Sequence, residues 1–122
     1  MSILMKDFFE MMLDFFPHLK NDYEMSIKLQ GELLETVVIE NVFMPEVIKL
    51  LQKNKNISLL KRIFSYFEEI SNCADEDLLN VFSVTVLEIL GNEREVLQVG
   101  QLYMGPKTNQ LQIEADKDLG RL

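Results

Sequence analysis

The chain has 122 residues, with 12 Lys and Arg against 20 Asp and Glu, one Cys, one His and no Trp. A single Cys excludes an internal disulfide scaffold and a zinc site made of several cysteines, and it fits a reducing compartment. The net charge of −8 argues against a nucleic-acid-binding protein, because such proteins cluster Lys and Arg against the phosphate backbone.

The first predicted helix extends from an N-cap at Ser2 to the residue before Pro17, because a residue before proline avoids the helical region. Its Met and Phe residues form two adjoining stripes. Together they make an apolar arc of about 200°, roughly twice what a surface helix needs. This width predicts a helix packed between two other elements. The alternative is that one stripe contacts a partner through adaptable Met and Phe side chains.

The next segment, residues 18–44, contains conflicting signals. The β-branched residues Val37, Val38 and Ile39 favour a strand. No other segment is a convincing strand partner, so we expect residues 36–43 to be a helix or an extended connector. Pro45 suits the first position of a following helix.

Residues 57–71 repeat apolar side chains at 3–4 spacing and predict an amphipathic helix. Asp75 is the expected N-cap of the next helix, 76–90, which is apolar on nearly all sides and is therefore expected to be the most buried one. On that basis Val84→Asp should unfold the protein. Glu88 interrupts the apolar pattern and is expected to face the rim or to accept hydrogen bonds.

Two further helices are predicted after residue 91. Asn92 and Glu95 resemble a capping box at the start of the first. Gly105 suits a left-handed closing position, Pro106 begins the last helix, and Gly120 ends it. We therefore predict a single all-α domain, 1–122, of compact antiparallel helical hairpins. The pairs 57–90 and 92–119 suggest a HEAT-like short α-solenoid.

No motif in the chain predicts catalysis. His18 has no nucleophile or second ligand near it in sequence, and Cys73 is surrounded by carboxylates that disfavour a thiolate. The acidic run that begins at Asp75 lacks the glycine and terminal glutamate of a calcium loop, and Gly105 to Thr108 lacks the spacing of a phosphate-binding loop. We therefore expect no enzyme activity, no catalytic residue, no cofactor and no metal.

The longest apolar stretch, Val81 to Leu90, is too short to cross a bilayer, which takes about 20 residues. The N-terminus also lacks the uninterrupted apolar run of a secretory signal. We expect a cytoplasmic protein that binds neither membrane nor nucleic acid.

Several short motifs in the second half resemble those of a family of small, uncharacterised bacterial all-helical proteins. These motifs are Phe64-x-x-Phe67-Glu68-Glu69, Val84-Thr85-Val86-Leu87-Glu88-x-Leu90, Tyr103-Met104-Gly105-Pro106-x-Thr108 and Lys117-x-Leu119-Gly120-Arg121. The resemblance implies a compact helical fold without known catalysis. It also implies a link to polymorphic-toxin genes, beside which such proteins are suspected immunity proteins.

We therefore expect a non-catalytic protein-binding module, with immunity against a basic bacterial toxin domain as its specific form. An acidic protein would be steered toward such a partner. The alternative is a helical adaptor or a homo-oligomeric subunit, such as a homodimer, that docks through the Met/Phe-rich N-terminal helix.

The candidate partner-binding residues are the two densest groups of carboxylates. They are Glu68, Glu69 and Asp77 around one turn, and Glu114, Asp116 and Asp118 near the end of the last helix. The structural interpretation of the same residues is that they cap helices or form solvated faces.

Overall fold

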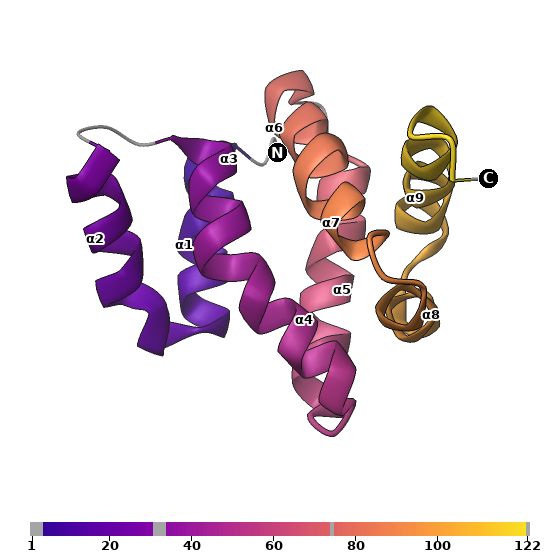
Figure 1. Cartoon of the computed structure of the whole chain (residues 1–122), viewed down its shortest axis with the longest axis horizontal. Coiled ribbons are helices and arrows are strands. Elements are labelled where there is room, and N and C mark those ends of the chain that lie inside the picture. Colours follow the sequence, from indigo (N-terminus) through magenta and orange to yellow (C-terminus); the bar gives the residue numbers. More distant parts are fainter. Residues whose placement is uncertain (1–3, 31–33, 74, 122) are drawn as a thin grey trace.

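The computed structural model describes residues 4–30, 34–73 and 75–121, and within these ranges it contains helices and no strand (Figure 1). The all-α fold class is therefore confirmed. The predicted N-cap Ser2 lies outside the described residues. The first described helix begins at Met5 and ends at Phe15, before Pro17 as expected.

The elements follow one another with short connections. They are α1 (Met5–Phe15), the 3₁₀ turn η1 (Pro17–Leu19), α2 (Lys20–Gln30), α3 (Glu35–Val38), the π-helical segment η2 (Ile39–Phe43), α4 (Met44–Lys53), α5 (Ile57–Ser71), α6 (Glu76–Val81), the π-helical segment η3 (Phe82–Leu87), α7 (Glu88–Leu90), α8 (Arg94–Tyr103) and α9 (Pro106–Asp118). The α3–η2–α4 and α6–η3–α7 segments are each one continuous helix with a π-helical middle. The two π-helical segments pack against each other.

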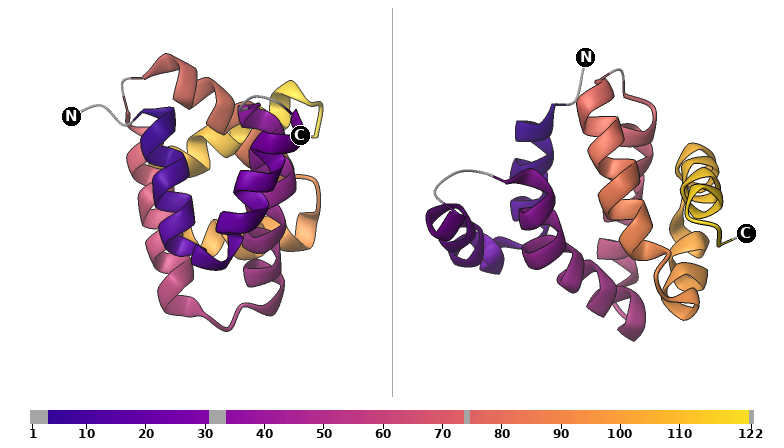
Figure 2. Two further views of the ribbon diagram at one scale, coloured as in Figure 1. Left: turned by 90° about the vertical axis from the view of Figure 1, so that its left-hand side faces the viewer. Right: turned by 45° about the horizontal axis from the view of Figure 1, so that its top comes forward.

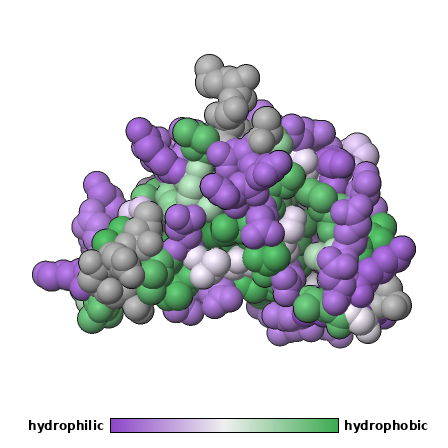
Figure 3. Space-filling model, turned by 90° about the horizontal axis from the view of Figure 1, so that it is seen from above, coloured by the Kyte–Doolittle hydropathy of each residue, from purple (hydrophilic) through white to green (hydrophobic). Residues whose placement is uncertain are grey.

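The molecule is elongated, with α2 at one end and α9 at the other (Figures 1 and 2). Helix α5 lies between them and packs against α6, α8 and α9. Its residues Leu60, Ile63, Phe64, Phe67 and Ile70 are completely buried. Seen from above, hydrophilic and apolar side chains are interspersed over the surface (Figure 3).

The segment 36–43 is helical, because tertiary burial outweighs its preference for a strand. Val38, Ile39 and Phe43 have at most 1% of their surface exposed. The π-helical geometry of η2 precedes Pro45, which has no N–H and would collide with a carbonyl of a regular helix. The Met44 N–H donates to the Ile39 carbonyl across this wider turn.

Helix α1 is packed between two elements, as its wide apolar arc predicts. The Phe8 ring stacks on Tyr66 of α5 with 6.4 Å between centroids, and Phe9 contacts Phe43 of η2 at 6.0 Å. Most of the Met and Phe side chains are therefore part of the core. Met5 and Met11 are left partly exposed.

The helix over 76–90 is only partly covered, and the expectation that Val84 lies in the core is wrong. Val84 is 47% exposed, whereas Val86 is fully buried. When a helix is apolar on nearly all sides, its sequence does not specify which side the neighbouring helices cover. Here the side that carries Val84 borders a groove beside α9.

The last two helices are inclined to each other, and the HEAT-like arrangement stays a prediction. Helix α8 is seen nearly end-on in Figure 1, whereas α9 is seen from its side. Gly105 has an extended backbone (φ −74°, ψ 174°), so its predicted left-handed conformation is wrong. The predicted capping box is also wrong, because Glu93 is the N-cap of α8 and the Asn92 side chain accepts a hydrogen bond from Arg121. Gly120 does adopt the left-handed conformation, at φ 72°.

Candidate functional site

A groove between the 76–90 helix and α9 combines an apolar floor with a negatively charged rim. Its volume is about 280 Å³. It is lined by Asn80, Ser83, Val84, Glu88, Leu111, Glu114, Ala115, Asp118 and Leu119. Val84 and Leu119 are 47% and 44% exposed, and no Lys or Arg is among the lining residues.

Three carboxylates border this acidic groove, and two of them were predicted. Glu114 and Asp118 are one helical turn apart on α9, so they share a face, and both are exposed. Glu88 comes from α7 on the opposite wall. Glu114 accepts one long hydrogen bond, 3.4 Å, from Gln110. In the described part of the chain, none of the three carboxylates forms an ion pair.

Asp116, predicted together with Glu114 and Asp118, points elsewhere. It is only 4% exposed and forms an ion pair with Arg121 at 3.4 Å. The Arg121 guanidinium also donates to the Glu88 carbonyl at 3.0 Å and to the Asn92 side-chain oxygen at 2.6 Å. These contacts attach the C-terminal end of α9 to the turn after α7. Asp116 therefore has a structural role within the fold.

Gly91 lies beside this attachment and leaves space for it. A Cβ at Gly91 would approach the Asp116 carboxylate oxygen to 2.5 Å and the Arg121 Nη1 to 2.6 Å. Buried Gln112 completes the contact by donating to the Leu87 carbonyl at 2.9 Å and to Asp116 at 3.2 Å. The close approach of α9 to the preceding turn thus depends on a residue without a side chain.

Glu68 has a comparable role at the other end of α9. Its carboxylate accepts hydrogen bonds from the backbone N–H of Thr108 at 2.8 Å and of Lys107 at 3.1 Å, and from the Thr108 hydroxyl at 3.0 Å. These N–H groups belong to the first turn of α9, where a helix has no internal acceptors and favours negative charge. Glu68 therefore caps α9 from a different helix.

Two further observations support this capping role. Burial by itself would raise the pKa of Glu68, but the hydrogen bonds from Thr108, Lys107 and Asn72 lower it below the ordinary value. A Cβ at Gly105 would lie 2.5 Å from the Glu68 carboxyl carbon. Gly105 is thus needed for close approach rather than for a left-handed turn.

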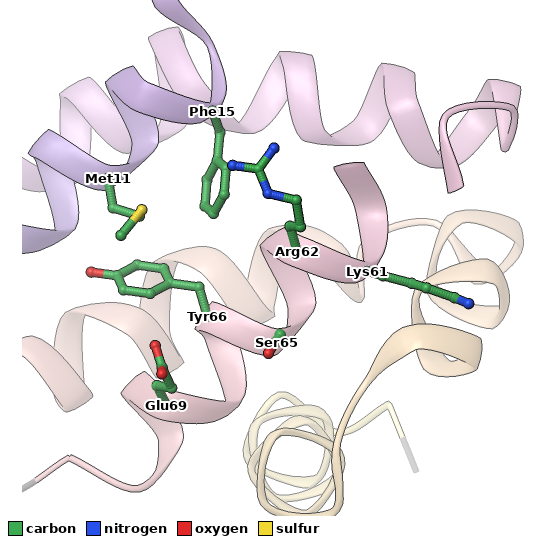
Figure 4. Close-up of a pocket in the computed structure, with 7 residues that line it drawn as sticks. All are labelled: Met11, Phe15, Lys61, Arg62, Ser65, Tyr66 and Glu69. Atoms are coloured by element: carbon green, nitrogen blue, oxygen red, sulfur yellow. The ribbon is translucent and has the colours of Figure 1, made fainter. Parts of the chain in front are cut away.

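The remaining predicted residues lie apart from the acidic groove. Asp77 is exposed in the first turn of α6. Its neighbour Asp75 is the N-cap as predicted and accepts from the Leu78 N–H at 2.8 Å. Glu69 is exposed and lines a different groove, between α1 and α5 (Figure 4). That these two carboxylates bind a partner stays a prediction.

The arrangement of the carboxylates suits electrostatic attraction better than metal coordination. Among the described residues, no three His, Cys, Asp or Glu side chains converge closely enough to hold a metal ion. His18 lies 3.6 Å from Glu46 and is exposed. None of the described helices has both the length and the apolar character needed to cross a bilayer.

Sequence reasoning did not assign Val84, Leu119 and Glu88 to a shared site. Glu88 could have indicated the exposed side of the 76–90 helix, because a carboxylate in an otherwise apolar helix marks a side that is not fully covered. The missing information was the position of α9, which forms the opposite wall.

These features define a small all-α protein with an acidic groove between its C-terminal helix and the 76–90 helix. The chain belongs to the family described as a domain of unknown function, DUF7674, whose model matches residues 9–119. No curated protein and no solved structure matches it significantly.

Proposed function

We propose that this chain is a non-catalytic protein-binding module whose acidic groove holds a basic, partly apolar segment of a partner protein. The observation that carries the proposal is the combination in one groove of three carboxylates and two half-exposed apolar side chains. Glu88, Glu114 and Asp118 supply negative charge, and Val84 and Leu119 supply apolar surface.

The charged and the apolar residues of the groove would affect different steps of binding, namely association and dissociation. The net charge of −8 and the acidic rim would speed the encounter with a basic surface, an effect that salt weakens. Burial of Val84 and Leu119 would slow dissociation, because apolar contacts act only at short range. A segment with alternating Lys or Arg and apolar residues matches both features.

The more specific proposal is that the partner is a basic toxin domain and that the chain acts as its immunity protein. The support is the motif resemblance in the second half together with the acidic character of the groove. A gene for a large secreted protein with a variable C-terminal domain, next to the gene for this chain, would identify the toxin to test. Co-expression of the two should then rescue cells that the toxin domain alone kills.

The binding test uses charge reversals in the groove and a matched control elsewhere. Glu114→Lys with Asp118→Lys removes the predicted attraction, while Asp22→Lys with Glu24→Lys makes the same change in net charge on the exposed surface of α2. Each protein is used to capture partners from cells that express it naturally, and association rates are then measured over a range of salt concentrations.

We expect the groove variant to lose the partner, or to bind it at least tenfold more slowly and with a weaker salt dependence. The α2 variant should bind like the wild type. Equal binding by the two variants would show that net charge, and not the groove, attracts the partner. A variant with Val84→Ser and Leu119→Ser should instead mainly raise the dissociation rate.

A further inference from the structure

A second groove lies between α1 and α5, and it shares no lining residue with the acidic groove. Its volume is about 580 Å³. Its lining residues are Met11, Phe15, Lys61, Arg62, Ser65, Tyr66 and Glu69, which Figure 4 shows. Its apolar lining consists of partly exposed Met11 and of the rings of Phe15 and Tyr66, which are only 8% and 7% exposed, and the charged residues come from α5.

The charges of this α1–α5 groove are separated along its length. Lys61 and Arg62 lie toward the start of α5, with the Arg62 guanidinium 5.6 Å from the centre of the Phe15 ring. Glu69 lies two turns further along α5. Within the described residues, neither Arg62 nor Glu69 forms an ion pair.

Tyr66 lies between the basic and the acidic residues along α5. Burial raises the pKa of the Tyr66 hydroxyl, and the nearby charges of Asp7 and Glu69 raise it further. The Tyr66 hydroxyl itself is buried without a hydrogen-bond partner among the described residues. The groove therefore has a basic end, an apolar middle and an acidic end.

Two identical grooves that run in opposite directions therefore match, because the basic end of each lies against the acidic end of the other. Arg62 and Glu69 are equally far from the midpoint between Ser65 and Tyr66. They are seven residues apart, so they lie on nearly the same side of α5 and about 10 Å apart along its axis. An antiparallel copy of α5, related by a two-fold axis at that midpoint, places each Arg62 against the Glu69 of the second copy. The short, exposed side chain of Ser65 allows the helices to approach at the axis.

We propose that the α1–α5 groove is occupied by the same groove of a second copy of this chain, in a two-fold symmetric dimer with antiparallel α5 helices. Two-fold dimers are the commonest assemblies of identical chains, and their contacts pair residue i with j and j with i. The symmetry therefore makes each Arg62–Glu69 pair twice.

The negative charge of the whole chain acts against this dimer but does not prevent it. At about 0.15 M salt the Debye length is about 8 Å, so repulsion between distant carboxylates is largely screened. Contact pairs that apolar side chains partly shield from water are screened less. The dimer contact uses none of the residues that line the acidic groove, because the two grooves share no lining residue.

Sedimentation velocity over a wide concentration range tests the proposal with a charge-swap design. The wild type should form a dimer. Arg62→Glu and Glu69→Arg should each weaken dimerisation at least tenfold, because each places like charges together at two symmetric points. The double variant should recover most of the wild-type affinity, since it restores opposite charges in the reversed order. Lys28→Glu, on the exposed surface of α2, is the matched control and should have no effect.

Cross-linking tests the geometry independently of charge. In a Cys73→Ser background, Ser65→Cys should form an intermolecular disulfide under mild oxidation, because the two residues 65 lie next to the axis. Ser58→Cys is the control. The two residues 58 would be about 22 Å apart along the helix axes, beyond the reach of a disulfide.

A wild type that stays monomeric at every concentration would overturn the proposal. So would a double charge variant that folds normally by circular dichroism and stays as weak as the single ones. Equal cross-linking through positions 58 and 65 would overturn the antiparallel geometry. A single variant that fails to fold leaves the cross-linking result to decide.

Discussion

Removing the Glu68 carboxylate should destabilise the protein by loosening α9 from α5. The carboxylate accepts three hydrogen bonds from Thr108 and Lys107, two of them from backbone N–H groups at the helix N-terminus. Hydrogen bonds to a charged group contribute about 1.5–3 kcal/mol each, and loss of a helix cap costs about 1 kcal/mol. Glu68 is only partly buried, so water replaces part of the lost contacts. We therefore expect Glu68→Gln to lower the free energy of unfolding by about 1–2 kcal/mol at pH 7.

The same substitution should change the pH dependence of stability in a defined direction. The folded-state pKa of Glu68 is below its unfolded value, so the ionised group stabilises the fold above the unfolded pKa of about 4.3. This contribution is lost as pH falls through the lower folded pKa. The difference in stability between wild type and Glu68→Gln should therefore shrink as pH falls below about 4.3.

Urea unfolding followed by circular dichroism measures the difference in free energy of unfolding between the wild type and Glu68→Gln, at pH 7 and at several pH values below 5. Glu24→Gln is the matched control, because its side chain is exposed on α2 and accepts no hydrogen bond among the described residues. Its effect should stay within about 0.5 kcal/mol. Equal costs for the two variants, or a Glu68→Gln cost that does not change with pH, would refute the capping role.

Four other substitutions test the packing. Gly105→Ala should lower the melting temperature in the wild type and much less in a Glu68→Ala background, because the added Cβ collides with the Glu68 carboxyl group. Val84→Asp should leave the protein folded with a cost near 1 kcal/mol or less, whereas Val86→Asp should prevent folding, as circular dichroism would show. Arg121→Ala should lower the free energy of unfolding by about 2–3 kcal/mol, because it leaves the buried Asp116 carboxylate without its cation and removes two further hydrogen bonds. An unchanged urea midpoint would contradict the attachment of α9.

The sequence by itself determined where most helices begin and end, because those signals act within one or two turns. Pro17 stops α1 through its effect on the preceding residue, and Asp75 caps α6 through a bond to an N–H three residues away. The 3–4 spacing of apolar residues in 57–71 likewise predicts α5 and its buried side. The wide Met and Phe arc of α1 correctly indicated a helix between two neighbours.

The tertiary structure alone decided what the carboxylates do. Glu68 meets Thr108 across 40 residues, and Arg121 reaches the Glu88 carbonyl across 33. No local pattern separates Glu68 from exposed Glu69, or buried Asp116 from exposed Glu114 and Asp118, because the difference is the position of α9. The same position leaves Val84 uncovered and forms the second wall of the acidic groove. Short-range backbone preferences thus set the helices, while the side chains available for binding depend on how those helices pack.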